Sequence, residues 1–308
     1  MAKKATRESY GAALVKYGEN PNIVVLDADL SKSTKTEMFK KAYPERFINM
    51  GIAEANMIST AAGLATCGKI VFASSFAMFA AGRAFEQVRN SVCYPNLNVK
   101  VCATHAGVSV GEDGATHQAL EDVAIMRALP NMTVISPCDA VETRAAIKAA
   151  IDNYGPFYVR LGRLAVEEIN DADTYKFELG KGVTLKEGTD VTLIATGLMV
   201  GEALKAQKIL AEENISARVI NIHTIKPIDK DIIIKAAKET GALVSCEEHN
   251  VIGGLGSAVC DVLCEREPVK VLKIGMNDVY GESGPAVKLL EKYGLDAAGI
   301  YAKIKAWL

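Results

Sequence analysis

The chain has 308 residues, of which 49% are hydrophobic and 23% charged, and its formal net charge is −2. This composition is typical of a globular protein that can bury one large core or two smaller ones. It contains no basic excess for nucleic acid, and its most apolar segment, Ile70–Ala81, is too short to cross a bilayer. The opening residues lack a signal-peptide pattern, so we expect a cytoplasmic protein.

Seven cysteines are scattered along the chain, and neither His nor a second cysteine pair lies near Cys260 and Cys264. We therefore expect reduced, buried thiols and no metal site.

Short runs rich in β-branched residues alternate with amphipathic stretches in the first half of the chain. The predicted strands are Asn22–Asp29, Lys69–Ser75, Asn98–His105, Met132–Pro137 and Phe157–Arg163. Between them, Ala53–Gly68 and Ala140–Gly155 are predicted helices, each closed by its glycine. Because these strands are apolar at consecutive positions, both faces of the sheet must be covered. That is typical of a parallel α/β sheet.

The pattern changes in Leu164–Asp190, which is charged and rich in turn residues, and a second α/β series follows. Its predicted strands are Val191–Gly197, Ala217–Ile225, Ala242–His249 and Val269–Gly275. Its predicted helices run to Glu213, over Asp229–Gly241 and near Ser257–Glu265, with two more in the tail. We predict two α/β domains, residues 1–165 and 190–308, joined by a linker over 166–189.

One acid, Glu54, lies among small and apolar residues in the segment NMGIAEANM, Asn49–Met57. Burial among apolar neighbours raises the pKa of a carboxyl group, which suits proton exchange with a weak base. A buried structural hydrogen bond is the commoner fate of such a residue.

The densest polar stretch, Thr104–Asp122, begins where a predicted strand ends and contains His105, Glu112, Asp113 and His117. Ligands of open α/β sheets bind beyond the carboxyl ends of the strands. We interpret this stretch as a binding site, with a helix starting near Ala119. A surface loop whose His and Asp only cap turns is the alternative.

Two other predicted strands end in charged residues. The first ends in Asp27 and Asp29, either of which could cap the next helix. Strand alternation places Arg160 within the fifth strand and Arg163 near its exit. An arginine at this edge suits a phosphate or carboxylate, and a structural salt bridge is the alternative.

Two motifs favour structural interpretations when they are taken alone. Phe76, Phe79 and Phe85 have helical spacing, which usually indicates core. The segment GGLGSA, Gly253–Ala258, resembles half of a dinucleotide fingerprint, but a tight turn explains its glycines equally well.

The order of several motifs resembles that of transketolases. NMGIAEANM is followed by FASSFAMF, by THAGVSVGEDGATHQALED and by RLGR, and GEDGATHQ is the most specific of them. The similarity covers nearly the whole chain and corresponds to the pyrimidine-binding and C-terminal domains. No match to the magnesium-diphosphate motif of the family's first domain occurs. The chain therefore resembles the C-terminal subunit of a split transketolase.

The resemblance implies that the cofactor is thiamine diphosphate and assigns residues to it. In this family a Glu, here Glu54, hydrogen-bonds the aminopyrimidine ring and helps to remove the C2 proton of the thiazolium ring. Phe79 corresponds to the residue that stacks on the aminopyrimidine, with Phe76 beside it, and Asp29 to an acid near the thiazolium. A further tyrosine of the family falls near Gly82 and Arg83 in this chain.

The resemblance also implies transfer of a two-carbon ketol unit from a ketose phosphate to an aldose phosphate. The catalytic residues would be Glu54 and His117. His117 would contact the terminal hydroxyl of the donor sugar, and Asp113 would contact another sugar hydroxyl. The residues that would hold the substrate phosphate are Arg7, Ser33, His105 and Arg163.

The implied partner is an N-terminal subunit with the diphosphate-binding domain and the Mg²⁺ ligands. Two copies of each subunit would form a heterotetramer, in which the C-terminal domain, from about residue 190, supports self-association. His223 and His249 are expected to be structural.

Other functions remain open at this point. The β subunit of a 2-oxo acid dehydrogenase has the same domains but fits GEDGATHQ poorly, and a deoxyxylulose-phosphate synthase normally carries all three domains in one chain. A transketolase relative for an unusual sugar phosphate would retain the same motifs. A scaffold without catalysis would not need Glu54, Phe79, Asp113 and His117 together, and a nicotinamide oxidoreductase would rest on GGLGSA alone.

Overall fold

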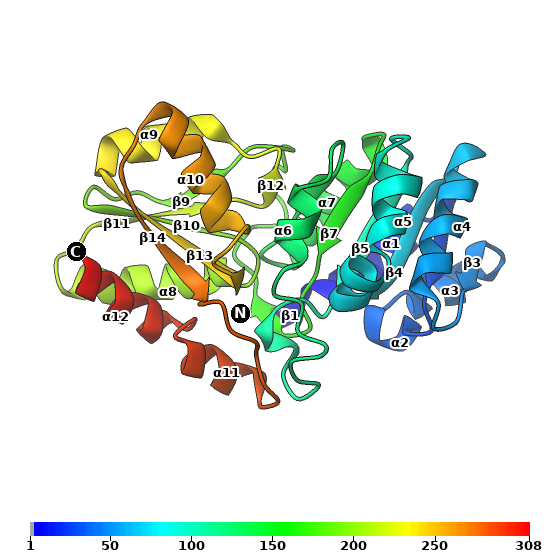
Figure 1. The fold of residues 1–308 in the computed structure, drawn as a ribbon, viewed down its shortest axis with the longest axis horizontal. Helices are drawn as coiled ribbons and strands as arrows, with labels where there is room; N and C mark the ends of the chain where they lie inside the picture. Colours follow the sequence, from blue (N-terminus) through cyan, green and yellow to red (C-terminus); the bar gives the residue numbers. More distant parts are fainter. Residues whose placement is uncertain (1–2) are drawn as a thin grey trace.

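The first half of the chain folds around a mostly parallel sheet in a computed structural model, which describes residues 3–308 (Figure 1). Its strands are β2 (Ile23–Asp27), β3 (Phe47–Asn49), β4 (Ile70–Phe76), β5 (Val99–Thr104), β6 (Thr133–Ile135), β7 (Phe157–Arg160) and β12 (Thr224–Lys226). They lie in the order β12-β6-β7-β5-β4-β2-β3. Within residues 3–308, only the β12–β6 pair of this sheet is antiparallel.

Helices cover both faces of this sheet, as the apolar strands require. One face carries α1 (Thr6–Tyr17), α3 (Glu37–Ala42) and α7 (Ala140–Asp152). The other carries α4 (Glu54–Thr66), α5 (Phe85–Gln87), α6 (Asp122–Arg127) and two π-helices, η2 (Met78–Arg83) and η3 (Val88–Cys93). Shorter elements are α2 (Ser31–Thr34), η1 (Pro44–Arg46), η4 (Val108–Val110) and the pair β1 (Lys3–Ala5) and β8 (Ala165–Glu167).

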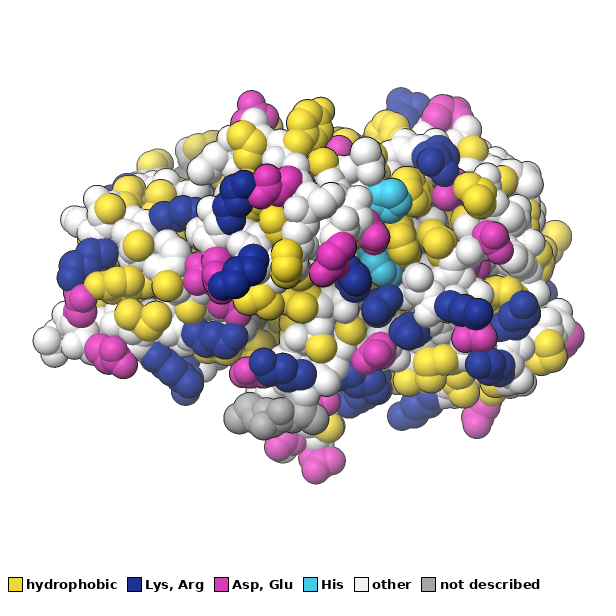
Figure 2. Space-filling model, turned by 90° about the horizontal axis from the view of Figure 1, so that it is seen from below, with side chains coloured by type: hydrophobic (Ala, Val, Ile, Leu, Met, Phe, Trp, Pro, Cys, Tyr) yellow, Lys and Arg dark blue, Asp and Glu magenta, His cyan; other side chains and the backbone are white. Residues whose placement is uncertain are grey.

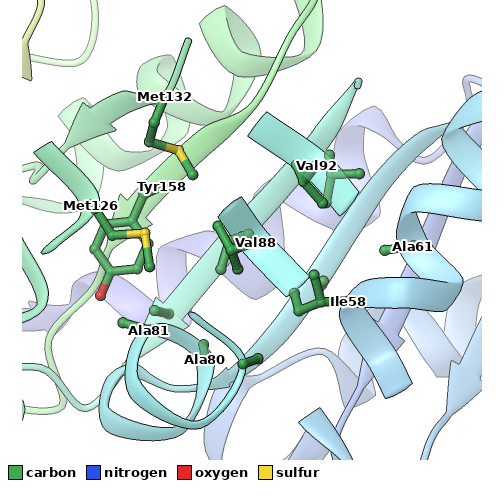
Figure 3. Packing of buried hydrophobic residues seen from close by; sticks show 14 of the residues in the cluster. Ile58, Ala61, Ala80, Ala81, Val88, Val92, Met126, Met132 and Tyr158 are labelled. Atoms are coloured by element: carbon green, nitrogen blue, oxygen red, sulfur yellow. The ribbon is translucent and has the colours of Figure 1, made fainter. Parts of the chain in front are cut away.

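Strand alternation divides the buried residues of the first domain between two cores. On β2, Val24 and Leu26 join one core, while Ile23 and Val25 join the other. The first of these cores contains side chains of α4, η2, η3, α6 and β7, and Figure 3 draws it with Ile58, Ala80, Val88, Met126 and Tyr158 among its labelled members.

The second half of the chain forms its own α/β domain beside the first (Figure 1). Its sheet contains β9 (Val183–Lys186), β10 (Val191–Ala195), β11 (Ala217–Asn221), β13 (Ala242–Asn250) and β14 (Lys270–Met276). The strand order is β14-β13-β10-β11-β9, with β9 antiparallel to β11. Its helices are α8 (Met199–Glu212), α9 (Lys230–Thr240), α10 (Leu255–Arg266), α11 (Ala286–Tyr293) and α12 (Ala297–Trp307).

The predicted strand Ala217–Ile225 is wrong as a single element, because it splits between the two sheets. Its first part is β11 of the second domain, and its end pairs with β6 of the first domain as β12. The backbone of Ser136 donates to the carbonyl oxygen of His223 at 2.8 Å, next to this crossing. A continuous apolar run cannot reveal such a change of sheet, since both halves are buried strands.

Other differences concern the ends of elements and their surroundings. The helix expected to close at Gly155 ends at Asp152, and the next residue, Asn153, is extended. The helix expected near Ala119 begins at Asp122. Strand β9 lies inside the segment expected as a linker. Cys67 and Cys264 are exposed, whereas we expected buried thiols.

Arg160 forms a buried ion pair within the first domain and also reaches the second, which settles the alternatives for Arg160 in favour of the structural one. The Nε atom of Arg160 donates to Oδ2 of Asp122 at 2.8 Å, and its Nη2 atom donates to the carbonyl oxygen of Glu248 in β13 at 2.9 Å. Burial acts to raise the pKa of Asp122, but the Arg160 guanidinium, together with His249 and the Tyr158 hydroxyl, holds that pKa below its usual value.

We expect Asp122→Asn to lower the free energy of unfolding by about 3–5 kcal/mol, because it leaves Arg160 buried without a counter-charge. Asp152→Asn is the control: it removes the half-exposed Lys148–Asp152 pair and should change the free energy of unfolding by less than about 1 kcal/mol. Urea denaturation at neutral pH measures both. Because the fold lowers the pKa of Asp122, the contribution of its carboxylate to the free energy of unfolding is complete above the ordinary Asp pKa. That contribution is lost as the pH falls through the folded pKa. Equal losses in the two variants would contradict the assignment.

Candidate functional site

The predicted site residues gather where the parallel strands of the first domain end. Asp29 follows β2, Glu54 follows β3, Phe76 ends β4, His105 follows β5 and Arg163 follows β7. Because the carboxyl ends of parallel strands meet at one edge of the sheet, residues far apart in the chain come together there.

Glu54 is the first residue of α4 and is buried, with a relative exposure of 1%. The Ser75 hydroxyl donates to its Oε1 atom at 3.3 Å, and Arg83 Nη1 donates to its Oε2 atom at 2.8 Å. The Arg83 guanidinium also lies 4.6 Å from the centroid of the Phe79 ring. Sequence reasoning found the buried acid but missed this arginine as its partner, since no short-range spacing relates residues 54 and 83.

Aromatic rings continue from Glu54 along the same edge of the sheet. Phe76 and Phe79 lie nearly parallel at 13°, with ring centroids 6.1 Å apart. His105 stacks on Phe76 at 3.8 Å, and His117 meets Phe79 edge-on at 5.2 Å. Phe79 remains partly exposed. Phe79 is therefore more than a core residue, whereas Phe76 is buried beneath His105.

A cationic group lies beyond His105. Arg7 Nη1 donates to the carbonyl oxygen of Ser33 at 2.9 Å and lies 3.2 Å from His105 Nε2. Burial above all, followed by the charges of Arg7 and Arg163, lowers the pKa of His105 to about 3. His105 is therefore neutral near pH 7, so Nε2 accepts from Arg7, and the Nδ1 proton is donated to Thr104 Oγ1 at 2.9 Å.

Arg163 and Asp113 lie on the outer side of this group. Arg163 Nη1 donates to Glu112 Oε2 at 2.7 Å and also to the carbonyl oxygen of Val110. Because Glu112 is exposed, its ion pair with Arg163 is weak and leaves the guanidinium available to an anionic ligand. Asp113 is exposed in the same loop.

The two acids at the end of β2 have different environments. Asp27 is buried and organises the turn that follows: its carboxylate accepts from Leu30 N at 2.6 Å and from Thr34 Oγ1 at 2.7 Å. Asp29 is exposed, has a φ of 64° and accepts from Asn49 Nδ2 at 2.8 Å. Asp27 is thus the structural acid, and Asp29 is the one at the open edge.

The second domain supports the histidine loop of the first. Gln118 Nε2 donates to the carbonyl oxygen of Glu282 at 2.9 Å, and the backbone of Ser109 donates to the Glu248 carboxylate. At Gly107, φ is 82°, and a Cβ atom would lie 2.3 Å from the Glu248 carboxyl carbon. A side chain at residue 107 would therefore displace the loop.

The glycines of GGLGSA make a turn and do not form an open phosphate site. The Glu247 carboxylate accepts from Leu255 N at 2.6 Å and from Gly256 N at 2.8 Å. These N–H groups at the start of α10 are the ones that a dinucleotide phosphate would need. A Cβ atom on Gly254 would lie 1.9 Å from Glu247 Oε2, which explains the glycine.

The remaining histidines are buried, as expected for structural residues. His223 packs on Phe177 with ring centroids 4.2 Å apart, and burial lowers its pKa to about 4. Among residues 3–308, no cluster of His, Cys, Asp or Glu is arranged to hold a metal ion. Over the same range, no helix is long and apolar enough to span a bilayer.

Histidine side chains reach the surface beside hydrophobic side chains, with several lysines and arginines next to them (Figure 2). This face joins a planar, apolar wall, a buried carboxylate and a group of cations. Such a surface fits a ligand that combines an aromatic ring with an anionic group.

The two domains match two family descriptions that together cover nearly the whole chain. Residues 2–168 match the transketolase pyrimidine-binding domain, and residues 180–300 match the transketolase C-terminal domain. The chain therefore belongs to the transketolase family.

Several relatives match the chain over almost their full length. A putative transketolase C-terminal section from Methanocaldococcus jannaschii is 54% identical, over 98% of this chain and 95% of the relative. A 6-deoxy-6-sulfo-D-fructose transketolase subunit from a Clostridium species is 45% identical, over 96% and 91%. A solved split-gene transketolase, described as an inactive beta4 tetramer, is 59% identical with a TM-score of 0.91, over 98% of this chain and 97% of that one.

The chain corresponds to about half of a single-chain transketolase. Rat transketolase is 40% identical over 98% of this chain, which covers 49% of the rat protein.

We expect His105 to remain neutral from about pH 5 to pH 8, because its folded pKa is about 3. Its ring signals in NMR spectra should not shift over this range. Folding lowers the pKa of His105 from its unfolded value near 6.5. The free energy of unfolding is therefore unaffected by His105 above about pH 6.5 and falls as the pH drops from there toward the folded pKa. A titration midpoint for His105 between about pH 6 and pH 7, close to the ordinary histidine pKa, would contradict its burial beside two arginines.

Proposed function

We propose that this chain is the C-terminal subunit of a thiamine-diphosphate-dependent transketolase, which moves a two-carbon ketol unit between sugar phosphates. The observation that carries the proposal is the buried Glu54 carboxylate, which Arg83 connects to the partly exposed ring of Phe79. The names of the full-length relatives support the family-level part of this proposal.

The residues around Glu54 fit the aminopyrimidine half of the cofactor. The Ser75 hydroxyl donates to one carboxylate oxygen of Glu54, Oε1, and Arg83 donates to the other, Oε2. Glu54 would share one proton with a ring nitrogen: its carboxyl group would donate that proton from Oε2, and the carboxylate would then accept a hydrogen bond from the protonated nitrogen. Phe79, with Phe76 beside it, would stack on the ring and exclude water from it, while Asp29 would lie near its positively charged half. When bound, thiamine diphosphate supplies the carbanion chemistry for breaking and making the carbon–carbon bond.

The residues beyond Phe76 fit a sugar that carries an anionic end group. Arg7 and Arg163 would supply positive charge, while the neutral His105 and Ser33 would add hydrogen bonds. His117, edge-on to Phe79, would contact the donor's terminal hydroxyl, and Asp113 a further hydroxyl.

A transketolase for an unusual sugar is the second candidate. An apulose-4-phosphate transketolase subunit from Phocaeicola vulgatus is 40% identical over 96% of this chain, and the sulfofructose relative is 45% identical. Phosphate and sulfonate are both tetrahedral anions that two arginines can bind. The two candidates differ in the sugar and share the roles of the residues.

We also propose that catalysis needs an N-terminal subunit, which would bring the diphosphate-binding domain and the Mg²⁺ ligands, in an assembly with two copies of each subunit. Ile52, two residues before Glu54, is 78% exposed, and Ile48 and Met38 are exposed as well. Apolar side chains around a half-formed site suit a partner surface. The relatives described as subunits support the need for a partner, as does the inactive beta4 tetramer of the split-gene relative.

We expect transfer from xylulose 5-phosphate to ribose 5-phosphate when this chain is mixed with an N-terminal subunit, thiamine diphosphate and Mg²⁺. Glu54→Gln should fold and assemble normally but lower turnover by about 10²–10⁴-fold, because the amide cannot share a proton with the ring. Activity of the chain alone would contradict the need for a partner. Near-normal turnover of Glu54→Gln would contradict the role of the carboxylate.

We expect Arg163→Ala to raise KM for phosphorylated acceptors by about tenfold or more, since it removes a charge-assisted hydrogen bond. Unphosphorylated aldoses should be nearly unaffected, and they are the internal control for folding. Initial rates with both acceptors test this expectation. Equal changes in KM would instead identify a structural arginine that holds the Val110–Glu112 loop.

A further inference from the structure

Arg83 has no role in the proposed function, yet it makes a close contact with Glu54. Its Nη1 atom lies 2.8 Å from Oε2 of Glu54, nearer than the Ser75 hydroxyl lies to Oε1 at 3.3 Å. The contact joins a carboxylate that is 1% exposed to an arginine side chain that is 49% exposed. The cation therefore reaches from the solvent side to a carboxylate that is itself buried.

Arg83 makes two contacts at once, one through an edge and one through a face. Its N–H group donates to Glu54, and the flat face of its guanidinium covers the Phe79 ring at 4.6 Å. A 4-aminopyrimidine ring bound to the same residues would place a ring nitrogen, which shares one proton with the carboxyl group, toward Glu54 and a flat face toward the phenyl ring. Guanidinium and aminopyrimidine share a planar N–C–N unit, so the arginine resembles the ring in shape and resembles its protonated form in hydrogen bonding.

We propose that Arg83 is an internal occupant of the pyrimidine position, which closes the Glu54 site in the free chain and leaves it when the aminopyrimidine binds. The identity of the incoming ring rests on the proposed function. The closure itself rests on the contacts of Arg83 with Glu54 and Phe79.

The electrostatics of Glu54 explain why an occupant stabilises the empty site. A buried carboxylate without a charged or hydrogen-bonded partner is strongly unfavourable. Ser75 offers one hydroxyl, and Arg83 supplies the positive charge. When the ring arrives, a ring nitrogen that shares a proton with Glu54 replaces the guanidinium, so Glu54 keeps a hydrogen-bond partner after the exchange.

The local backbone places Arg83 for this exchange. Phe79 and Arg83 are four residues apart in the π-helix η2, so both side chains project from the same side of one helical segment. Because half of the Arg83 side chain is already exposed, its head can rotate into solvent without movement of the main chain. The closed state then lowers the apparent affinity for the cofactor by the fraction of chains that remain closed.

The first experiment uses the chain alone and does not depend on thiamine diphosphate. Arg83→Ala should lower Tm, because Glu54 stays buried without its cation, and millimolar guanidinium chloride should recover about 2 °C relative to equal sodium chloride. The wild-type chain and the Arg83→Ala, Glu54→Gln double variant should show no such gain. Arg89→Ala is the matched control, since Arg89 is an exposed arginine that hydrogen-bonds Asn90. Absence of rescue in Arg83→Ala would overturn the closure.

The second experiment uses the complex with the N-terminal subunit and Mg²⁺. Titration calorimetry with thiamine diphosphate should give an affinity about tenfold higher for Arg83→Ala than for wild type, with Arg89→Ala unchanged. Arg83→Lys should fall between them, because an ammonium keeps the charge but lacks the flat face. Weaker binding by Arg83→Ala would overturn the proposal, since Arg83 would then hold the cofactor and not compete with it.

The two experiments separate this inference from the proposed function. If the wild-type complex binds no thiamine diphosphate although guanidinium rescues Arg83→Ala, the proposed function fails and the closure stands. If wild type binds the cofactor and Arg83→Ala shows neither rescue nor tighter binding, the closure fails and the proposed function stands.

Discussion

The common carboxyl edge of the parallel strands is the constraint on which the candidate site depends. A parallel ladder brings the ends of β2, β4, β5 and β7 to one side, so each connection that leaves a strand passes the same place. Asp29, Phe76, His105 and Arg163 meet there, although they span more than a hundred positions of the chain. Glu54 joins them from the start of α4, next to the edge strand β3. An antiparallel arrangement of the same strands would have divided these side chains between two edges.

The second domain supports this edge of the first sheet through hydrogen bonds and through strand β12. Arg160 binds Asp122 of the first domain and a main-chain carbonyl of β13, while β12 extends the first sheet. Gln118 and the backbone of Ser109 attach the histidine loop to the second domain. A loop rich in glycine has little rigidity of its own, so these contacts determine where His105 and His117 lie. The C-terminal domain thus has a physical role in the site, although we place no catalytic residue in it.

The site combines residues whose charges are balanced in different ways. His105 lies among cations and is neutral, because a buried imidazolium beside Arg7 would be unfavourable. Glu54 is buried and is paired with Arg83, whereas Arg163 is paired with the exposed Glu112. An incoming anionic ligand would therefore meet one weakly held arginine at the surface, and an incoming ring would meet an occupied carboxylate deeper in the site.

Much of the fold could be predicted because it follows from local patterns. Consecutive apolar strands and alternating helices closed by glycine identified two α/β domains, as the end of α9 at Gly241 illustrates. Residues that leave a strand could also be placed at the ligand edge without coordinates. Ends of elements were less accurate, since competing turns, as near Ala119 and Gly155, differ by little free energy.

The sequence by itself determined the class of fold, the family and the candidates Glu54, Phe79, His105 and His117, because each rests on a pattern or motif within a short window. The tertiary structure decided the choices that depend on distant partners. It distinguished the buried Asp27 from the open Asp29, moved β12 into the first sheet, made Arg160 structural and placed Arg83 on Glu54. Each of these depends on contacts between segments whose spacing carries no local signal, since only packing brings such residues together and determines which charges become buried.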